Sequence, residues 1–210
     1  MGAHSYWILV PTLLLAAGCA TFSRFGTART GEVGESRWTV TLDGGEGSFD
    51  GETPDERIFV PTPHLRWEKV LAPQWELGVE AGVPGMVGAD VKRELLRSTW
   101  FDLAVAPGVS AGLYSSDGPL LIGQVPIIAD VVLTDWLVLV PHLSAGWGAT
   151  FDDREDLNHS PLVGGGLGVW FRLGDGFAVQ PTVSSTWELD TLYVHRRIGL
   201  AISFGPQPGF

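Results

Sequence analysis

One polar segment of the chain gathers side chains that could do chemistry. Residues 152–160 contain four acids, an amide and a histidine. Carboxylates bind divalent cations, and a carboxylate beside a histidine can activate water for hydrolysis. An EF-hand is excluded because its central Gly and terminal Glu are missing, so we expect a solvated acidic loop that binds, at most, divalent cations. The side chains concerned are Asp152, Asp153, Arg154, Glu155, Asp156, Asn158 and His159.

Three other patterns have a structural explanation that we favour over a chemical one. His159 and Ser160 are adjacent, but no G-x-S-x-G motif or strand-to-helix turn presents the serine as a nucleophile. The glycine-rich residues 164–168 lie within a predicted strand with no following lysine or helix, so they indicate close packing and not a phosphate loop. Further histidines come from separate predicted strands without cysteine ligands, which favours polar packing over a metal site. These histidines are His64, His142 and His195.

The N-terminus carries a targeting signal. Residues 7–20 form an apolar run that is too short for a membrane-spanning helix but suits the core of a secretory signal. Cys19, the single cysteine, follows the small residues 16–18. This arrangement resembles the lipobox of bacterial lipoproteins and implies that Cys19 is acylated and becomes the first mature residue. The alternative is an ordinary signal peptide cut near Ala20, with Cys19 discarded.

Composition sets the class of the mature chain. A hydrophobic content of 45% with 18% charged residues excludes disorder, and 28 Gly with 14 Pro in 210 residues disfavour long helices. The net charge of -11 would repel a phosphate backbone, so nucleic acid is excluded as a partner. We expect a signal peptide at residues 1–18, a lipid-anchored periplasmic leader at 19–36 and one domain at 37–210.

From residue 37 onward the hydrophobic pattern has the period of β-strands. Between Trp75 and Val83 every second residue is apolar, whereas Glu76 and Glu80 lie on the opposite face. Turn residues separate such segments at intervals of about ten residues. The same rule predicts ten strands, with eight as the alternative number. The predicted strands are residues 37–44, 57–68, 74–83, 86–96, 100–112, 120–133, 136–149, 162–173, 177–189 and 193–204.

The connections between these strands alternate in length. Turns after strands two, four, six and eight are short. The other set includes the longer loops at residues 44–56 and 150–161, together with the polar residues 114–119 and the brief turns at 84–85 and 190–191. Short turns on one rim and longer loops on the other are typical of bacterial outer-membrane barrels. The apolar residues 120–143 are interrupted by Gly, Pro and Asp, which indicates two strands and not a membrane helix. We therefore predict an all-β fold, a closed antiparallel up-and-down transmembrane β-barrel.

The two strand faces differ in a way that indicates which one meets lipid. Aromatic residues on the apolar face fall near strand ends, as in the girdles of membrane barrels. The other face combines glycines with charges that can pair in a narrow lumen, and Arg66 is expected opposite Glu76. One girdle is Trp67, Trp75, Phe101, Phe171, Phe177 and Phe204, the other is Phe59, Trp147 and Trp187, and the lumen charges are Arg66, Glu68, Glu76, Glu80, Asp90, Lys92, Glu94, Asp102, Arg172, Glu188 and Arg197.

The last predicted strand also carries a recognisable spacing. Arg197, Gly199, Ile202 and Phe204 resemble the C-terminal assembly signal of outer-membrane barrels, although the chain continues to Phe210. The likeness implies handling by the barrel assembly machinery. The pattern of residues 37–204 as a whole resembles small lipidated outer-membrane β-barrel proteins, which implies an outer-membrane location with a lipid anchor on the periplasmic side and outer-membrane lipid as a partner.

Three functions fit this pattern. The first is an integral outer-membrane barrel with a structural, adhesive or narrow-channel role and a largely plugged lumen, because ten strands enclose little free space. The second is a lipid-tethered soluble barrel in the periplasm that binds an apolar ligand inside, in which case Val79 would face inward. The third follows from a resemblance to omptin proteases, whose Asp-x-His pair is absent here. We therefore expect no enzymatic activity, no catalytic residue and no cofactor or metal.

Overall fold

The computed structural model describes residues 25–47, 58–83, 85–114, 118–151, 157–190 and 193–210. The predicted signal segment, Cys19 and the acids at 152–156 lie outside these residues. The described chain is all β, and nowhere in it does a helix long and apolar enough to cross a membrane occur. Its strands are β1 Ser36–Gly47, β2 Ile58–Ala72, β3 Trp75–Gly82, β4 Met86–Leu96, β5 Phe101–Val105, β6 Gly108–Tyr114, β7 Gly118–Thr134, β8 Leu137–Phe151, β9 Leu157–Gly174, β10 Phe177–Glu188 and β11 Tyr193–Phe204.

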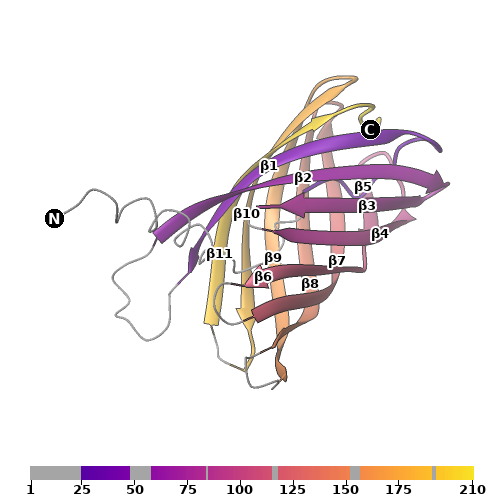
Figure 1. Cartoon of the computed structure of the whole chain (residues 1–210). Coiled ribbons are helices and arrows are strands. Elements are labelled where there is room, and N and C mark those ends of the chain that lie inside the picture. The colour runs from indigo at the N-terminus through magenta and orange to yellow at the C-terminus, as the bar shows by residue number, and fades with distance from the viewer. Residues whose placement is uncertain (1–24, 48–57, 84, 115–117, 152–156, 191–192) are drawn as a thin grey trace.

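The strands close into a single barrel, as predicted (Figure 1). Each strand pairs antiparallel with its neighbours. The pairing of β1 with β11 closes the barrel, and β3 pairs with both β2 and β4. β5 and β6 share one position between β4 and β7, so the described strands occupy ten positions. The expected strand at 100–112 is interrupted at Ala106 and Pro107 because proline has no N–H to donate. Closure leaves no edge strand to be protected.

The two rims differ as the sequence indicated. The short-turn rim carries the β2–β3, β4–β5, β7–β8 and β9–β10 turns, the start of β1 and the end of β11. The long-loop rim carries the other connections, apart from the interruption between β5 and β6, which lies within the wall. Figure 1 shows the C-terminus at the short-turn rim, beside the orange β9–β10 turn. Both ends of the sheet therefore lie at one rim.

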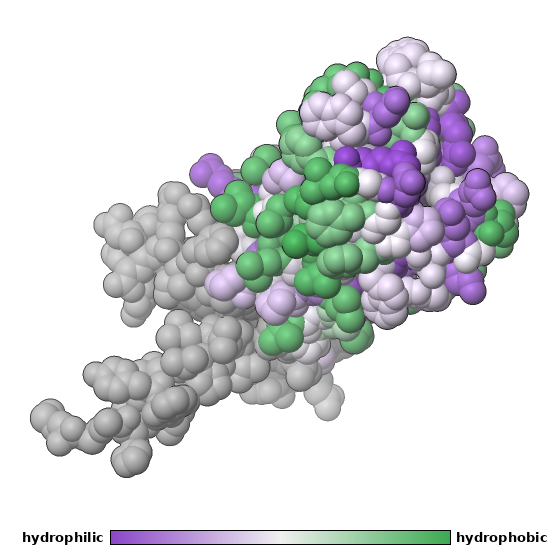
Figure 2. Space-filling model, turned by 90° about the horizontal axis from the view of Figure 1, so that it is seen from above, coloured by the Kyte–Doolittle hydropathy of each residue, from purple (hydrophilic) through white to green (hydrophobic). Residues whose placement is uncertain are grey.

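Alternation along the strands places most apolar residues outside and most polar ones inside, where a smaller group of buried apolar residues, including Val138, Val140 and Trp170, packs with Phe210. In β5, Asp102 and Ala104 are buried, whereas the alternate residues Phe101 and Leu103 are partly exposed. Leu143 on β8 and Val183 on β10 are 67% and 54% exposed, and Figure 2 shows hydrophobic residues gathered on the visible barrel wall. The soluble-barrel alternative predicts that the apolar face of the strands points inward. That prediction is wrong, since the apolar face lies on the outside of the barrel.

Aromatic residues gather near the short-turn rim. Phe177 contacts Phe204 with ring centroids 5.5 Å apart, and Trp136 stacks on Phe171 at 6.5 Å. Toward the other rim, Trp147 on β8 and Trp187 on β10 are 38% and 42% exposed. The side chain of Phe59 lies outside the described residues.

The pairing of Arg66 with Glu76 is a prediction that the structure corrects. Arg66 lies opposite Glu80, and Glu76 lies opposite Val70. β2 continues to Ala72, beyond its predicted end, so the hairpin closes through Pro73 and Gln74 alone and its centre moves two residues along the chain. Gln74 adopts a positive φ of 67°, which this tight turn requires.

Candidate functional site: the plugged lumen

Residues 25–31, here called the plug, lie inside the barrel. Phe25, Ala28 and Arg29 are buried there, at 6%, 0% and 7% exposure. At the short-turn rim, Gly34 donates to the Val70 carbonyl, which lies 2.9 Å from its nitrogen. This placement differs from the leader outside the barrel that the sequence indicated for residues 19–36. Of that leader, residues 19–24 lie outside the described chain.

Arg29 is the main side-chain anchor of the plug. Its guanidinium forms a bidentate pair with Asp102, with N–O distances of 2.8 and 3.0 Å, and donates to the Ser98 carbonyl at 2.6 Å. It also donates to the Gly209 carbonyl and lies 4.6 Å from the ring centroid of Phe210. One side chain thereby joins the plug, a turn of the short-turn rim and the C-terminal tail.

Carboxylates of the barrel wall satisfy the backbone of the plug. Asp130 accepts from the amides of Ala28 and Arg29 at 2.9 and 3.0 Å. Glu94 accepts from the amide and the hydroxyl of Thr30 at 2.8 and 2.9 Å. An irregular segment inside a barrel has no ladder partner, so these acids take the role that strand pairing plays elsewhere.

Two more wall residues hold the deeper end of the plug. Lys92 on β4 donates to the Thr27 carbonyl at 3.0 Å. The amide of Gly26 donates to the Gln180 side-chain oxygen on β10 at 2.8 Å. The plug therefore bonds to opposite sides of the barrel and spans its lumen.

The wall beside the plug is a network of buried ion pairs. Arg37 contacts Glu68 at 3.2 Å and Glu76 at 2.9 Å, and Lys92 contacts Glu76 at 2.7 Å. All four side chains are at most 7% exposed. Removing one member would strand a buried charge, which costs far more than the intact pair contributes to stability.

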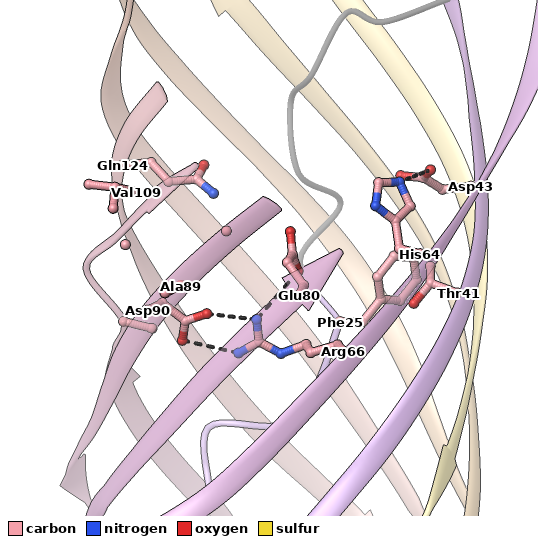
Figure 3. Close-up of a pocket in the computed structure, with 13 residues that line it drawn as sticks. Phe25, Thr41, Asp43, His64, Arg66, Glu80, Ala89, Asp90, Val109 and Gln124 are labelled. Carbon is pink, nitrogen blue, oxygen red and sulfur yellow. Dashed lines mark hydrogen bonds and ion pairs between the residues drawn. The ribbon is translucent and has the colours of Figure 1, made fainter. Parts of the chain in front are cut away.

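Arg66 is the centre of a second group of ion pairs. It contacts Glu68 at 2.9 Å, Asp90 at 2.6 Å and Glu80 at 3.4 Å, and so links β2, β3 and β4. Figure 3 shows its guanidinium between Asp90 and Glu80. Together the two groups hold three bases, Arg37, Arg66 and Lys92, and four acids, Glu68, Glu76, Glu80 and Asp90, and each acid contacts at least one of the bases.

Further pairs continue toward the long-loop rim. Asp43 on β1 contacts His64 at 3.2 Å and Arg197 at 3.0 Å, and His195 contacts Glu188 at 2.8 Å. A cavity of about 30 Å³ borders Phe25 in this region, which is room for about two water molecules. It is lined by Phe25, Asp43, His64, Arg66, Glu80 and Asp90 among others (Figure 3).

Glycines make room for these long side chains. A Cβ on Gly78 would overlap the Arg66 guanidinium and lie 2.9 Å from Asp90. A Cβ on Gly199 would lie 2.7 Å from the Phe25 ring and 2.8 Å from the Asp43 Cβ. These two positions let the arginine cross β3 and let the plug reach β11.

The predicted lumen charges have different surroundings in the structure. Those of β2 to β5 join the plug and the Arg66 network, whereas Arg172 pairs at the short-turn rim with Asp175, whose side chain is fully exposed. Arg97, in the turn after β4, pairs with Glu94 at 2.5 Å, and this hydrogen bond raises the pKa of Arg97. The structure adds lumen residues that the sequence reasoning missed: Arg29, Arg37, Asp43 and Asp130.

A charge count could have indicated the missing residues. The predicted lumen set holds four bases, Arg66, Lys92, Arg172 and Arg197, against seven acids. Buried acids need donors, so the excess required more cations or free backbone amides in the lumen. The plug and Arg37 supply both.

The proposed assembly segment has a two-sided arrangement. Arg197 and Gly199 face the lumen, where they contact Asp43 and Phe25, whereas Ile202 and Phe204 lie on the outer face. Phe210 turns back inside and meets Trp170 with ring centroids 5.2 Å apart. Only Phe204 therefore presents an aromatic ring outward at the end of β11.

The remaining candidate residues stay apart. The lumenal histidines lie on β2, β8 and β11, and no group of three or more His, Cys, Asp or Glu within the described ranges is arranged to hold a metal ion. His159 is exposed and lies beside Trp147, with ring centroids 5.8 Å apart. The glycine run lies within β9, where Gly166 passes close to the His142 ring. The loop at 152–156, with its predicted cation binding, lies outside the described residues.

Comparison with known proteins finds structural likeness alone. No family model and no curated protein matches the sequence. Among solved structures, LpxR from Salmonella typhimurium is 12% identical with a TM-score of 0.48, over 87% of this chain and 86% of that one. The NanC porin is 10% identical with a TM-score of 0.47, over 79% of this chain and 98% of that one. The outer membrane protein Ail of Yersinia pestis is 13% identical with a TM-score of 0.41, over 81% of this chain and 99% of that one. At such identities none of these names says what the present chain does.

Proposed function

We propose that the protein is an integral outer-membrane barrel that works as a closed scaffold for its long loops, in a structural or adhesive role. The observation that carries this proposal is the plug, which occupies the lumen from the short-turn rim to the level of Gly199 with the chain's own residues. A diffusion channel needs a continuous water path, whereas here ion pairs and plug contacts occupy the lumen.

The outer face supports a membrane location. A closed barrel satisfies every strand amide and carbonyl internally, which lipid demands. Exposed apolar side chains such as Leu143 and Val183 would destabilise a soluble protein but suit a hydrocarbon layer. Aromatic residues near both strand ends fit the headgroup level.

Processing at the N-terminus is part of the proposal. Residues 1–18 would direct export, and Cys19 would carry the lipid. Labelling of cells with radioactive palmitate tests this: label on the protein that disappears in Cys19→Ala supports acylation. An unlabelled protein whose N-terminus lies beyond Cys19 would favour the ordinary signal peptide.

The barrel proposal is tested by extraction and conductance together. We expect the protein to stay in outer membranes washed with carbonate and urea, to migrate differently before and after boiling, and to show no steady conductance in planar bilayers. Release by the wash would contradict membrane insertion. Steady conductance of the unaltered protein would contradict the closed lumen and favour a narrow channel.

We propose no enzymatic activity. The proposal rests on the lumen acids, because the described ones have structural partners in the plug or the wall. The two acids that contact a histidine, Asp43 and Glu188, belong to the same wall, and Asp43 also pairs with Arg197. Activity toward peptide or lipid substrates that is lost in Asp152→Ala or His159→Ala would overturn it.

A further inference from the structure

The plug has a direction. Gly34 bonds to Val70 at the short-turn rim, and Arg29 bonds to Ser98 and Asp102 just inside that rim. Phe25 lies deeper, against Gly199. The chain, followed toward its N-terminus, therefore moves away from the short-turn rim.

Register places Phe25 well inside the barrel. Gly199 pairs with Asp43, which is seven residues beyond the start of β1. Only four more residues of β1 remain to Gly47, about 13 Å along the strand. Phe25 also borders the cavity, whose lining includes Arg66 and Glu80 of the ion-pair network and His64, which lies two residues nearer the long-loop end of β2 than Arg66.

The path back to the short-turn rim is closed. The C-terminal tail bonds to the β9–β10 turn, since the amides of Gly205 and Gln207 donate to Gly176 and Asp175 at 3.0 Å each. Phe210 then fills the space between Trp170 and Arg29. A chain leaving Phe25 toward this rim would have to displace buried, bonded residues.

We propose that the chain is threaded through its own barrel, so that the residues before Phe25 leave at the long-loop rim. This inference rests on the proposed function. Cys19 is six positions before Phe25, and six steps of extended chain reach at most about 20 Å, enough to clear the rim. A lipid on Cys19 would then insert in the leaflet beside the long loops and not on the periplasmic side.

Cysteine labelling on intact cells tests the direction. Single variants Thr21→Cys and Ser23→Cys are compared with Asp190→Cys, exposed in the β10–β11 connection, and Thr99→Cys, exposed in the β4–β5 turn. Each is treated with a membrane-impermeant maleimide before and after the outer membrane is opened. The unaltered chain reports any free thiol of Cys19, and an unboiled gel shows that each variant forms a barrel.

We expect Thr21→Cys and Ser23→Cys to label on the same side as Asp190→Cys, at least tenfold above Thr99→Cys in intact cells. Labelling on the side of Thr99→Cys would overturn threading and leave the barrel intact. If Asp190→Cys and Thr99→Cys label alike, the barrel does not separate two compartments, and the membrane proposal falls together with threading.

Discussion

Arg29 is the residue at which the plug, the barrel wall and the C-terminal tail meet. Replacing it by alanine leaves Asp102 buried without its bidentate partner, and breaking a buried pair costs roughly 3–5 kcal/mol. We expect Arg29→Ala to lower the temperature at which the unboiled gel band disappears and to produce intermittent conductance. Arg196→Ala is the control, since that side chain is exposed and should cost under about 0.5 kcal/mol. Equal stability of the two variants would show that Arg29 does not hold the plug.

A substitution at Gly78 tests how tightly the Arg66 side chain is packed in the lumen. An alanine methyl there would displace the Arg66 guanidinium from Asp90, leaving polar groups unpaired at about 1–3 kcal/mol. We expect Gly78→Ala to lower the urea midpoint followed by tryptophan fluorescence. Gly123→Ala is the matched control, because nothing lies within 4 Å of its added Cβ. A midpoint unchanged in both variants would mean that Arg66 has room to move.

At this scale, alternation predicts which residues face inward but not which ones pair. Glu76, Glu80 and Asp102 were recognised from their strand face, and each is in the lumen. The partner of Arg66 depends on where a hairpin turns, and a shift of the β2–β3 hairpin centre by two residues changed it from Glu76 to Glu80. Such register depends on turn geometry that a period-two pattern does not contain.

Among elements, the strands could be predicted and the plug could not. A strand that faces lipid on one side and a polar lumen on the other must alternate, so its sequence records its position. Residues 25–31 have no strand partner and no period, and their amides bond to Asp130 and Glu94, more than sixty residues away. Composition alone makes such a segment look like a leader.

The outer face of β10 gives a prediction for the strands. Val183 lies between Phe177 and Trp187, and Arg in the middle of the lipid face costs about 2–4 kcal/mol but about 0–1 near the interface. We expect Val183→Arg to reduce the carbonate-resistant fraction several-fold. Val83→Arg, equally exposed but just beyond β3 at the long-loop rim, should insert normally. If Val183→Arg inserts as well as Val83→Arg, the exposed face of β10 does not meet lipid.

The two ends of the barrel domain meet in two places in the whole molecule: in the sheet and in the lumen. β1 pairs with β11, and the plug that precedes β1 contacts the tail that follows β11. The barrel must therefore close with the plug already inside it or admit the plug before the tail folds back.

This arrangement assigns different roles to the two aromatic residues at the C-terminus. Phe204 lies outward beside Phe177 and is 46% exposed, and we propose that it forms part of the assembly signal. Phe210 lies inward against Trp170 and Arg29, where it can only hold the lumen closed.

We expect Phe204→Ala to reduce the amount of barrel inserted into the membrane, with little change in the melting temperature of the inserted protein. Phe210→Ala should insert in normal amount but melt at a lower temperature, because the lost ring leaves a cavity beside Trp170. Quantifying folded and unfolded bands in washed membranes over a temperature series separates the two effects, and the opposite pattern would mean that the last residue is the assembly signal.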